Sequence, residues 1–403
     1  MKKQVFVTGL GVISPIGSGR SQFWENLCRG QVGTGEIHAF DTRDFSSHCG
    51  GEVFEFDPRR FLKRLAPEEV ARTTQFAIAV ARMACEDAGY MPDSSERVGI
   101  CFGTTMGNQS VVEKANDVWA SGATQLPFPA SPYPLNLIAG QIANELGTRG
   151  PALVLPTACA AGNYAIGWGM DLIQSGRTDV VIAGGSDALS RGCYAIFNRL
   201  GAIAKDVCRP FDKNRSGMMV SEGAGALLLE SAEHARARGA RLYAELLGYG
   251  LSCDAYHPVA PDPGGCGAIA SMQTALKSSG LSPDMVSYIS AHGTGTKTND
   301  VAESKAIRNV FGSRAESVPV SSIKSMLGHT MGAASALEAV ASVLAIFYKE
   351  LPPTANYSEA DPECLTNVVP NHAQKTETVR LALSNAFGFG GNVSTIALGA
   401  VGP

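Results

Sequence analysis

The sequence has few charged residues and almost no excess of either sign. Asp, Glu, Lys and Arg make up 17% of the chain, whereas a globular protein has about 25%. Its 33 basic and 37 acidic residues leave a net charge of −4 at pH 7. We expect neither nucleic acid nor a membrane surface as partner, because both attract basic proteins. The shortage of charge predicts that stacked layers or a second subunit cover much of the surface.

The ten cysteines show no pattern of a metal or disulfide site. They are scattered, without CxxC or Cys/His spacing. The apolar N-terminal stretch is broken by Thr8, Gly9, Gly11 and Pro15, so it predicts a buried strand and not a signal peptide. We find no apolar run of 18 residues to cross a bilayer. We therefore expect free thiols in a reducing cytoplasm, with no metal and no membrane.

Glycine is abundant instead, at 45 of 403 residues, which predicts many tight turns and close backbone approaches. Short β-branched runs alternate with longer helical stretches, as in α/β proteins. The predicted strands are 4–8, 98–103, 152–155, 179–183, 224–229, 244–251, 286–291, 318–321, 380–385 and 393–398. The predicted helices are 67–88, 135–146, 159–174, 300–311 and 332–349.

Five strands followed by five more predict a structural duplication. We place the halves at residues 1–243, which carry a candidate nucleophilic cysteine, and 244–403, which carry two candidate histidines and a lysine. No Pro-rich or Ser-rich linker separates them, so they should share one core. Strands such as DVVIAGG are apolar on both faces, which indicates a sheet covered on both sides. Helix 332–349 is apolar or small nearly all round and should be buried.

Cys159 lies where a predicted strand ends and a predicted helix begins, in LVLPTACAAGNYAIG. The free N–H groups and partial positive charge of a helix N-terminus stabilise a thiolate, so Cys159 is a candidate nucleophile with a lowered pKa. The small residues after it leave room for a substrate. A buried structural cysteine is the alternative, and it is the commoner case.

Two histidines follow strands in glycine-rich loops: His292 in SAHGTGT and His329 in KSMLGHTMG. Chemistry in α/β proteins is placed at such strand ends, although each histidine alone could be structural. Lys324 lies five residues before His329 among uncharged neighbours. A buried lysine would need a carboxylate, and we predict Glu303 as that partner.

A cysteine, two histidines and a lysine on strand-end loops indicate covalent acyl transfer. One imidazole would activate or orient the thiol, and two neutral imidazoles would donate hydrogen bonds to an oxyanion. Thr294 and Thr296 supply hydroxyls that would hold a substrate arm. The loop SNAFGFGGN at 384–392 carries phenylalanines that fit either core packing or a mobile gate.

These residues resemble the β-ketoacyl-[acyl carrier protein] synthase family in its elongating type II form. The resemblance runs over nearly the whole chain, from VFVTGLGVISPIG to FGFGGN. Its motifs, in family order, are TACAAG around Cys159, CRPFDKNRSG with EGAG, AHGTGTKTND around His292, KSMLGH around His329, and NAFGFGG around Phe389.

The resemblance implies a thiolase-like α/β fold, with duplicated βαβαβαββ halves in stacked layers. It implies an acyltransferase that carries out the decarboxylative Claisen condensation of a Cys-bound acyl group with malonyl-acyl carrier protein, in fatty acid or polyketide elongation. No cofactor is expected, because the substrates are carried on the phosphopantetheine of the carrier protein. The implied partners are that carrier protein and a second subunit, in a homodimer or a heterodimer with a related ketosynthase-like chain.

The resemblance also implies roles for the polar residues. Cys159 would accept the acyl chain. His292 and His329 would bind the malonyl thioester, promote loss of CO₂ and stabilise the enolate. Lys324, paired with Glu303, would orient the site.

Further roles concern the pocket. The backbone N–H groups of Cys159 and Phe389 would form an oxyanion hole, and Thr294 and Thr296 would bind the phosphopantetheine arm. Phe389 would gate the acyl pocket. Met106 and Phe197 would form walls of that pocket.

The chain departs from the family pattern in three places. Asn392 and Val393 stand where Thr or His followed by Asn is usual, Ser216 stands where Asp is common, and the loop 198–207 is short. Pocket depth and carrier choice therefore need not match those of housekeeping fatty acid synthases.

An acidic carrier protein needs a basic surface to bind. The densest basic cluster, RRFLKR, supplies Arg59, Arg60, Lys63 and Arg64. An ordinary solvated face is the alternative.

Four other functions stay open at this point. The first is a type II polyketide or polyene ketosynthase that works as a heterodimer with a non-catalytic chain-length partner. The second is that partner itself, which Cys159 argues against because such partners lack the nucleophile. A thiolase would use a second cysteine in place of two histidines. A cysteine hydrolase would need a general base and a water path.

Overall fold

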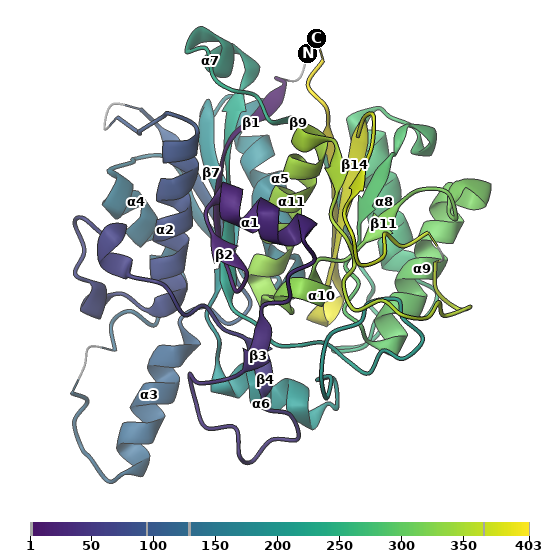
Figure 1. Cartoon of the computed structure of the whole chain (residues 1–403). Coiled ribbons are helices and arrows are strands. Elements are labelled where there is room, and N and C mark those ends of the chain that lie inside the picture. The colour runs from purple at the N-terminus through teal and green to yellow at the C-terminus, as the bar shows by residue number, and fades with distance from the viewer. Residues whose placement is uncertain (1–2, 94–95, 128–129, 366, 403) are drawn as a thin grey trace.

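The computed structural model of the protein describes residues 3–93, 96–127, 130–365 and 367–402 (Figure 1). All ten predicted strands are present. The main sheet contains β1 (Val5–Ser14), β2 (Gly17–Ser18), β5 (Val98–Gly103), β6 (Ala152–Leu155), β7 (Val180–Asp187), β8 (Gly223–Ser231), β9 (Ala244–Cys253), β10 (Tyr288–Ser290), β11 (Val320–Ser321), β14 (Leu381–Gly388) and β15 (Asn392–Gly399). Two small ribbons pair β3 (Thr34–Glu36) with β4 (Cys49–Gly51) and β12 (Glu350–Leu351) with β13 (Gln374–Lys375).

The two halves of the chain arrange their strands in the same order. The first half runs β6–β5–β7–β8–β1, and the second runs β11–β10–β14–β15–β9. In each half, the first two pairings are parallel and the last two are antiparallel. This shared strand order and pairing confirm the predicted duplication. β1 and β9 pair antiparallel and join both halves into one sheet, while the boundary after residue 243 stays a prediction.

Helices form layers on and between the two halves of the sheet (Figure 1). They are α1 (Arg20–Cys28), α2 (Arg72–Asp87), α3 (Gln109–Ala120), α4 (Leu137–Leu146), α5 (Ala161–Gln174), α6 (Arg191–Arg199), α7 (Ala232–Ala237), α8 (Cys266–Ser279), α9 (Lys297–Phe311), α10 (Lys324–Leu327) and α11 (Ala334–Tyr348). α5 and α11 pack together between the halves. α2 and α4 cover the outer face of the first half, and α8 and α9 lie outside the second. The predicted stacked α and β layers are confirmed.

The five predicted helices exist, with shifted starts. The helix predicted over 67–88 begins at Arg72, because Pro67–Glu69 form a separate 3₁₀ turn and Val70 is extended. α8, which packs on β9 and β15, is absent from the sequence predictions, as are α1, α3, α6, α7 and α10. α8 is rich in small and polar residues, and such a composition gives a weak apolar period.

Helix α11 forms the centre of the core, as predicted. Residues 334–346 are all buried. The window Met331–Tyr348 has a mean hydropathy of 1.6, sufficient in length and composition for a membrane span, but 89% of it is buried inside the protein. The window contains Glu338 and packs inside the protein, so it does not contradict the expectation that no apolar run crosses a bilayer. The window is apolar because it packs against the sheet on both sides.

Candidate active site

Cys159 lies in the turn between β6 and α5, as the sequence predicts. β6 ends at Leu155, and a 3₁₀ turn, Ala158–Ala160, leads directly into α5. Ala158 has φ +51°, a left-handed conformation that is uncommon outside glycine and occurs at functional sites. Gly388 packs so closely here that a Cβ on it would lie 3.1 Å from the Cys159 nitrogen. The turn therefore holds the cysteine firmly, and only 5% of Cys159 is exposed.

Cys159 opens into a cavity of about 430 Å³ built from both halves of the chain. The predicted site residues that line it are Cys159, Phe197, His292, Thr294, Thr296, His329 and Phe389. Because these residues come from five separate stretches of chain, only the packing of the halves assembles the site.

His292 follows β10 and is held through its backbone. The N–H groups of His292 and Gly293 donate to the two carboxylate oxygens of Glu303, at 2.9 and 2.8 Å. Asn385 Nδ2 donates to the same carboxylate at 3.2 Å. Nδ1 of His292 lies 3.4 Å from Lys324 Nζ and accepts from it, which leaves the ring proton on Nε2.

His329 lies between α10 and the 3₁₀ turn Met331–Ala333. Its Nδ1 accepts a hydrogen bond from the Met331 N–H at 3.2 Å, so its ring proton also sits on Nε2. The two imidazole rings are 5.5 Å apart and nearly perpendicular. Burial, and next the charge of Lys324, lower both imidazole pKa values well below 6.5. At neutral pH the site therefore offers two uncharged Nε2–H donors.

Lys324 pairs with Glu338 and not with Glu303, so the predicted pair was wrong. Lys324 Nζ donates to Glu338 Oε1 and, at 2.7 Å, to the backbone oxygen of His292. Glu303 instead accepts the two backbone N–H groups next to His292. Burial raises the pKa of both carboxyls to about 7. The two acids therefore position the histidine loop from different sides.

The resting Cys159 is a neutral thiol. Burial raises its pKa to about 12, which the charge of Lys324 only partly offsets. The prediction of a lowered thiol pKa was wrong, because desolvation of a nearly fully buried sulfur outweighs the partial charge of the helix N-terminus. The thiol must lose its proton as it attacks.

The glycine-rich loop that follows β14 carries the predicted gate. The Phe389 ring packs on Phe197 at 5.3 Å. Asn392, which departs from the family pattern, donates from its Nδ2 to the Phe389 carbonyl at 3.0 Å. This hydrogen bond links the two ends of the short loop 389–392. The Phe389 N–H belongs to the segment that touches the Cys159 turn, where an oxyanion hole is predicted.

Met106 and the predicted basic patch do not line the cavity. Met106 packs behind it, in a hydrophobic cluster with Phe197 and Phe389, and is not a lining residue. Its backbone N–H is tied to Asp187, which keeps it in that cluster, and its role as a wall of the acyl pocket behind Phe389 stays a prediction. The predicted basic patch, defined as Arg59, Arg60, Lys63 and Arg64, is exposed but lines no part of the cavity.

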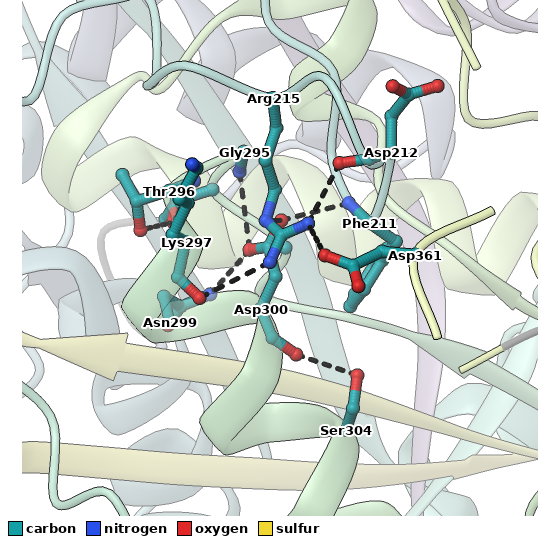
Figure 2. A network of polar contacts seen from close by, with 12 residues as sticks. Phe211, Asp212, Arg215, Gly295, Thr296, Lys297, Asn299, Asp300, Ser304 and Asp361 are labelled. Carbon is teal, nitrogen blue, oxygen red and sulfur yellow. Dashed lines mark hydrogen bonds and ion pairs between the residues drawn. The ribbon is translucent and has the colours of Figure 1, made fainter. Parts of the chain in front are cut away.

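A buried ion-pair network supports the loop that carries the two threonines (Figure 2). Arg215, 3% exposed, pairs with Asp300 and Asp361. Its Nη2 also donates to the backbone oxygen of Lys297 at 3.4 Å. Asp300 in turn accepts the Gly295 N–H at 3.3 Å. This wall of the cavity is therefore clamped from behind.

The sequence reasoning missed two acids that hold the site. Glu338 is the single charged residue of α11, and an isolated acid in an apolar helix was the signal for it. Asp187 ends the apolar strand β7 and accepts the N–H groups of Thr105 and Gly332, at 2.7 and 2.6 Å. It ties the segment after His329 to the first half of the sheet.

All ten cysteines are free, as expected. Within the described ranges, no group of three or more His, Cys, Asp or Glu side chains is placed to hold a metal ion.

Comparison with known proteins agrees with this geometry. The family described as "Beta-ketoacyl synthase, N-terminal domain" matches residues 2–235, and "Beta-ketoacyl synthase, C-terminal domain" matches residues 243–358. The 3-oxoacyl-[acyl-carrier-protein] synthase 2 of Synechocystis sp. is 42% identical over 98% of both chains. The ishigamide ketosynthase/chain length factor superposes with a TM-score of 0.95 at 42% identity, over 100% of both chains.

A second solved structure is a type II PKS acyl-carrier protein in complex with its ketosynthase bound to the hexaketide. It has a TM-score of 0.91 at 34% identity, over 100% of both chains. With matches of this extent, and a cysteine and two neutral histidines that line one cavity between duplicated halves, the chain belongs to the β-ketoacyl synthase family of acyltransferases.

Proposed function

We propose that this protein elongates acyl chains by decarboxylative Claisen condensation of a Cys159-bound acyl group with a malonyl group on an acyl carrier protein. One observation carries the proposal: Cys159 shares a cavity with His292 and His329, and both rings keep an Nε2–H donor at neutral pH. Donors of that kind meet negative charge on a thioester oxygen.

In the first step, the Cys159 sulfur attacks the acyl thioester of the carrier arm. The new carbon–sulfur bond forms as the bond to the pantetheine sulfur breaks. The proton of the Cys159 thiol passes to the departing pantetheine thiolate, so the transfer needs no outside base. The N–H groups of Cys159 and Phe389 stabilise the tetrahedral oxyanion.

In the second step, malonyl thioester loses CO₂, and the electron pair of the broken bond becomes an enolate. The Nε2–H groups of His292 and His329 donate to the enolate oxygen. One such donor is worth about 10²–10³-fold in rate. The enolate carbon then attacks the carbonyl carbon of the Cys159 thioester, and the bond from that carbon to the Cys159 sulfur breaks. The released thiolate takes one proton from solvent water, because burial raises the pKa of this thiol to about 12.

The substrates arrive on the phosphopantetheine of a carrier protein in the cytoplasm. The chain assembles with a second subunit, either another copy of itself or a related ketosynthase-like chain. The complex of a carrier protein with its ketosynthase and the ketosynthase/chain length factor support these two partners. The basic patch is the proposed docking surface for the carrier, and Thr294 and Thr296 hold the arm.

The relative named as 3-oxoacyl-[acyl-carrier-protein] synthase 2 favours the elongation of fatty acids by this chain. The heterodimeric polyketide or polyene ketosynthase is not favoured over it.

The experiment incubates the purified protein with acyl-carrier protein and measures the acyl adduct by intact mass. We expect one adduct on the wild type and none on Cys159→Ala. Cys28→Ala, a half-buried cysteine of α1, is the matched control and should load normally. A normal adduct on Cys159→Ala would reject the nucleophile.

A further inference from the structure

The segment from His292 to Thr298 forms one wall of the catalytic cavity from its floor to its rim. His292 and Thr294 are 3% and 7% exposed, Thr296 is half-buried, and Lys297 and Thr298 are exposed. All five line the cavity. A substrate arm with its thioester at His292 therefore leaves the cavity past Lys297.

The backbone of Lys297 is fixed while its side chain is free. Arg215 Nη2 binds the Lys297 carbonyl, and the guanidinium is itself held by Asp300 and Asp361 (Figure 2). Lys297 Nζ makes no hydrogen bond or ion pair with another residue that the structure describes. Arg215 and Asp254, which also line the cavity, are both engaged in bonds within the protein. Lys297 is thus an uncommitted cation on a rigid rim.

The chemistry around Lys297 suits an anion. Thr298 and Ser216 line the same cavity and are exposed. Gly217 N–H donates to the Gly295 carbonyl at 3.0 Å, so the chain at Ser216 runs beside the chain at Lys297. Ser216 stands where an Asp is common in the family. A carboxylate there would offset the positive charge of Lys297, whereas the Ser216 hydroxyl is neutral and leaves that charge available to an anion.

We propose that Lys297, with the hydroxyls of Thr298 and Ser216, binds the phosphate that ends the pantetheine arm. The assignment rests on the proposed function, because it takes the thioester end of the arm to lie at Cys159 and His292. Carrier protein and coenzyme A both present this phosphate. The shared ligand is therefore a phosphopantetheine, whatever bears it.

The test compares malonyl-phosphopantetheine with malonyl-pantetheine, which differ only in the phosphate. For the wild type we expect a kcat/KM about fivefold higher with the phosphate, the range of a partly exposed charge-assisted contact. Lys297→Gln should remove this preference by lowering kcat/KM on malonyl-phosphopantetheine much more than on malonyl-pantetheine, and Lys297→Arg should keep it. Ser216→Asp should reduce it by placing an anion on the rim.

Lys305→Gln is the matched control, because Lys305 is exposed on the same helix but lies outside the cavity. It should leave the preference intact. An unchanged preference in Lys297→Gln, or an equal loss on both substrates, would overturn the assignment.

Malonyl-carrier protein and malonyl-coenzyme A distinguish the two sources of phosphate. If Lys297→Gln lowers kcat/KM with both substrates, the result supports recognition of the phosphate. If it lowers kcat/KM with malonyl-carrier protein alone, Lys297 contacts the carrier surface and the proposal is overturned. Calorimetric binding of phosphopantetheine and pantetheine gives the same comparison without turnover. Because this binding measurement needs no condensation, it distinguishes a failure of the phosphate site from a failure of the proposed function.

Discussion

At the scale of single residues, burial decides which groups are charged. It lowers the pKa values of His292 and His329 and so keeps both rings as neutral donors. The same burial raises the pKa of Glu303 and Glu338 to about 7. The groups that titrate near neutral pH are therefore the supporting carboxyls and not the imidazoles.

This predicts an acid limb in malonyl decarboxylation near pH 7. As the pH falls through about 7, Glu303 and Glu338 take up protons, which weakens their hold on the His292 loop and on Lys324. The rate should fall with roughly two protons. Glu303→Gln leaves only the Glu338 carboxyl to titrate, so the acid limb of the pH–rate profile should become shallower. The rate above pH 8 should also drop, because the Glu303 carboxylate no longer holds the His292 loop. A limb of unchanged slope in a pH–rate series would contradict this.

At the scale of elements, α5 and α11 are packed almost backbone to backbone. A Cβ on Gly162 would lie 2.5 Å from the Ala336 nitrogen. Ser335 Oγ accepts the Asn163 N–H at 3.1 Å. The helix that begins beside Cys159 is thereby packed on the helix that carries Glu338.

Gly162→Ala should destabilise the protein by about 1–3 kcal/mol, because the added methyl meets fixed backbone. Gly169→Ala, on the same helix, is the matched control. There the added methyl would meet side-chain carbons at 3.1 Å, Leu229 Cδ1 and Val181 Cγ1, which can shift. Denaturant unfolding measures both. Equal costs for the two variants would show that the close crossing is not the cause.

At the scale of the whole molecule, the sheet ends in a strand with an open edge. β6 is the outermost strand of the first half, and Ala152 and Leu153 on it are exposed. Open, apolar edges attract further strands. With only 17% charged residues, the chain fits assembly with the proposed second subunit along this edge.

Leu153→Arg should shift the assembled protein toward monomer, because it places a charge in the edge that the second subunit would cover. Sedimentation velocity measures the shift. Met91→Arg, which changes an exposed apolar residue after α2, should leave the assembly unchanged. A wild-type-like dimer in Leu153→Arg would exclude the β6 edge as the interface.

The sequence alone predicted features that local order determines. The apolar runs located all ten strands of the duplicated halves, and the change from strand to helix located Cys159. The strand-end loops likewise marked His292 and His329, because such signals lie within a few consecutive residues.

Tertiary structure alone decided what depends on packing between distant segments. Lys324 pairs with Glu338 and not with Glu303 because α10 and α11 meet beside His292. Packing between distant segments likewise places Met106 in the cluster behind the cavity. The thiol pKa rose because desolvation is a property of everything packed around the sulfur. Charge state and partner choice follow from burial and distance in three dimensions, and neither quantity is contained in the spacing of residues along the chain.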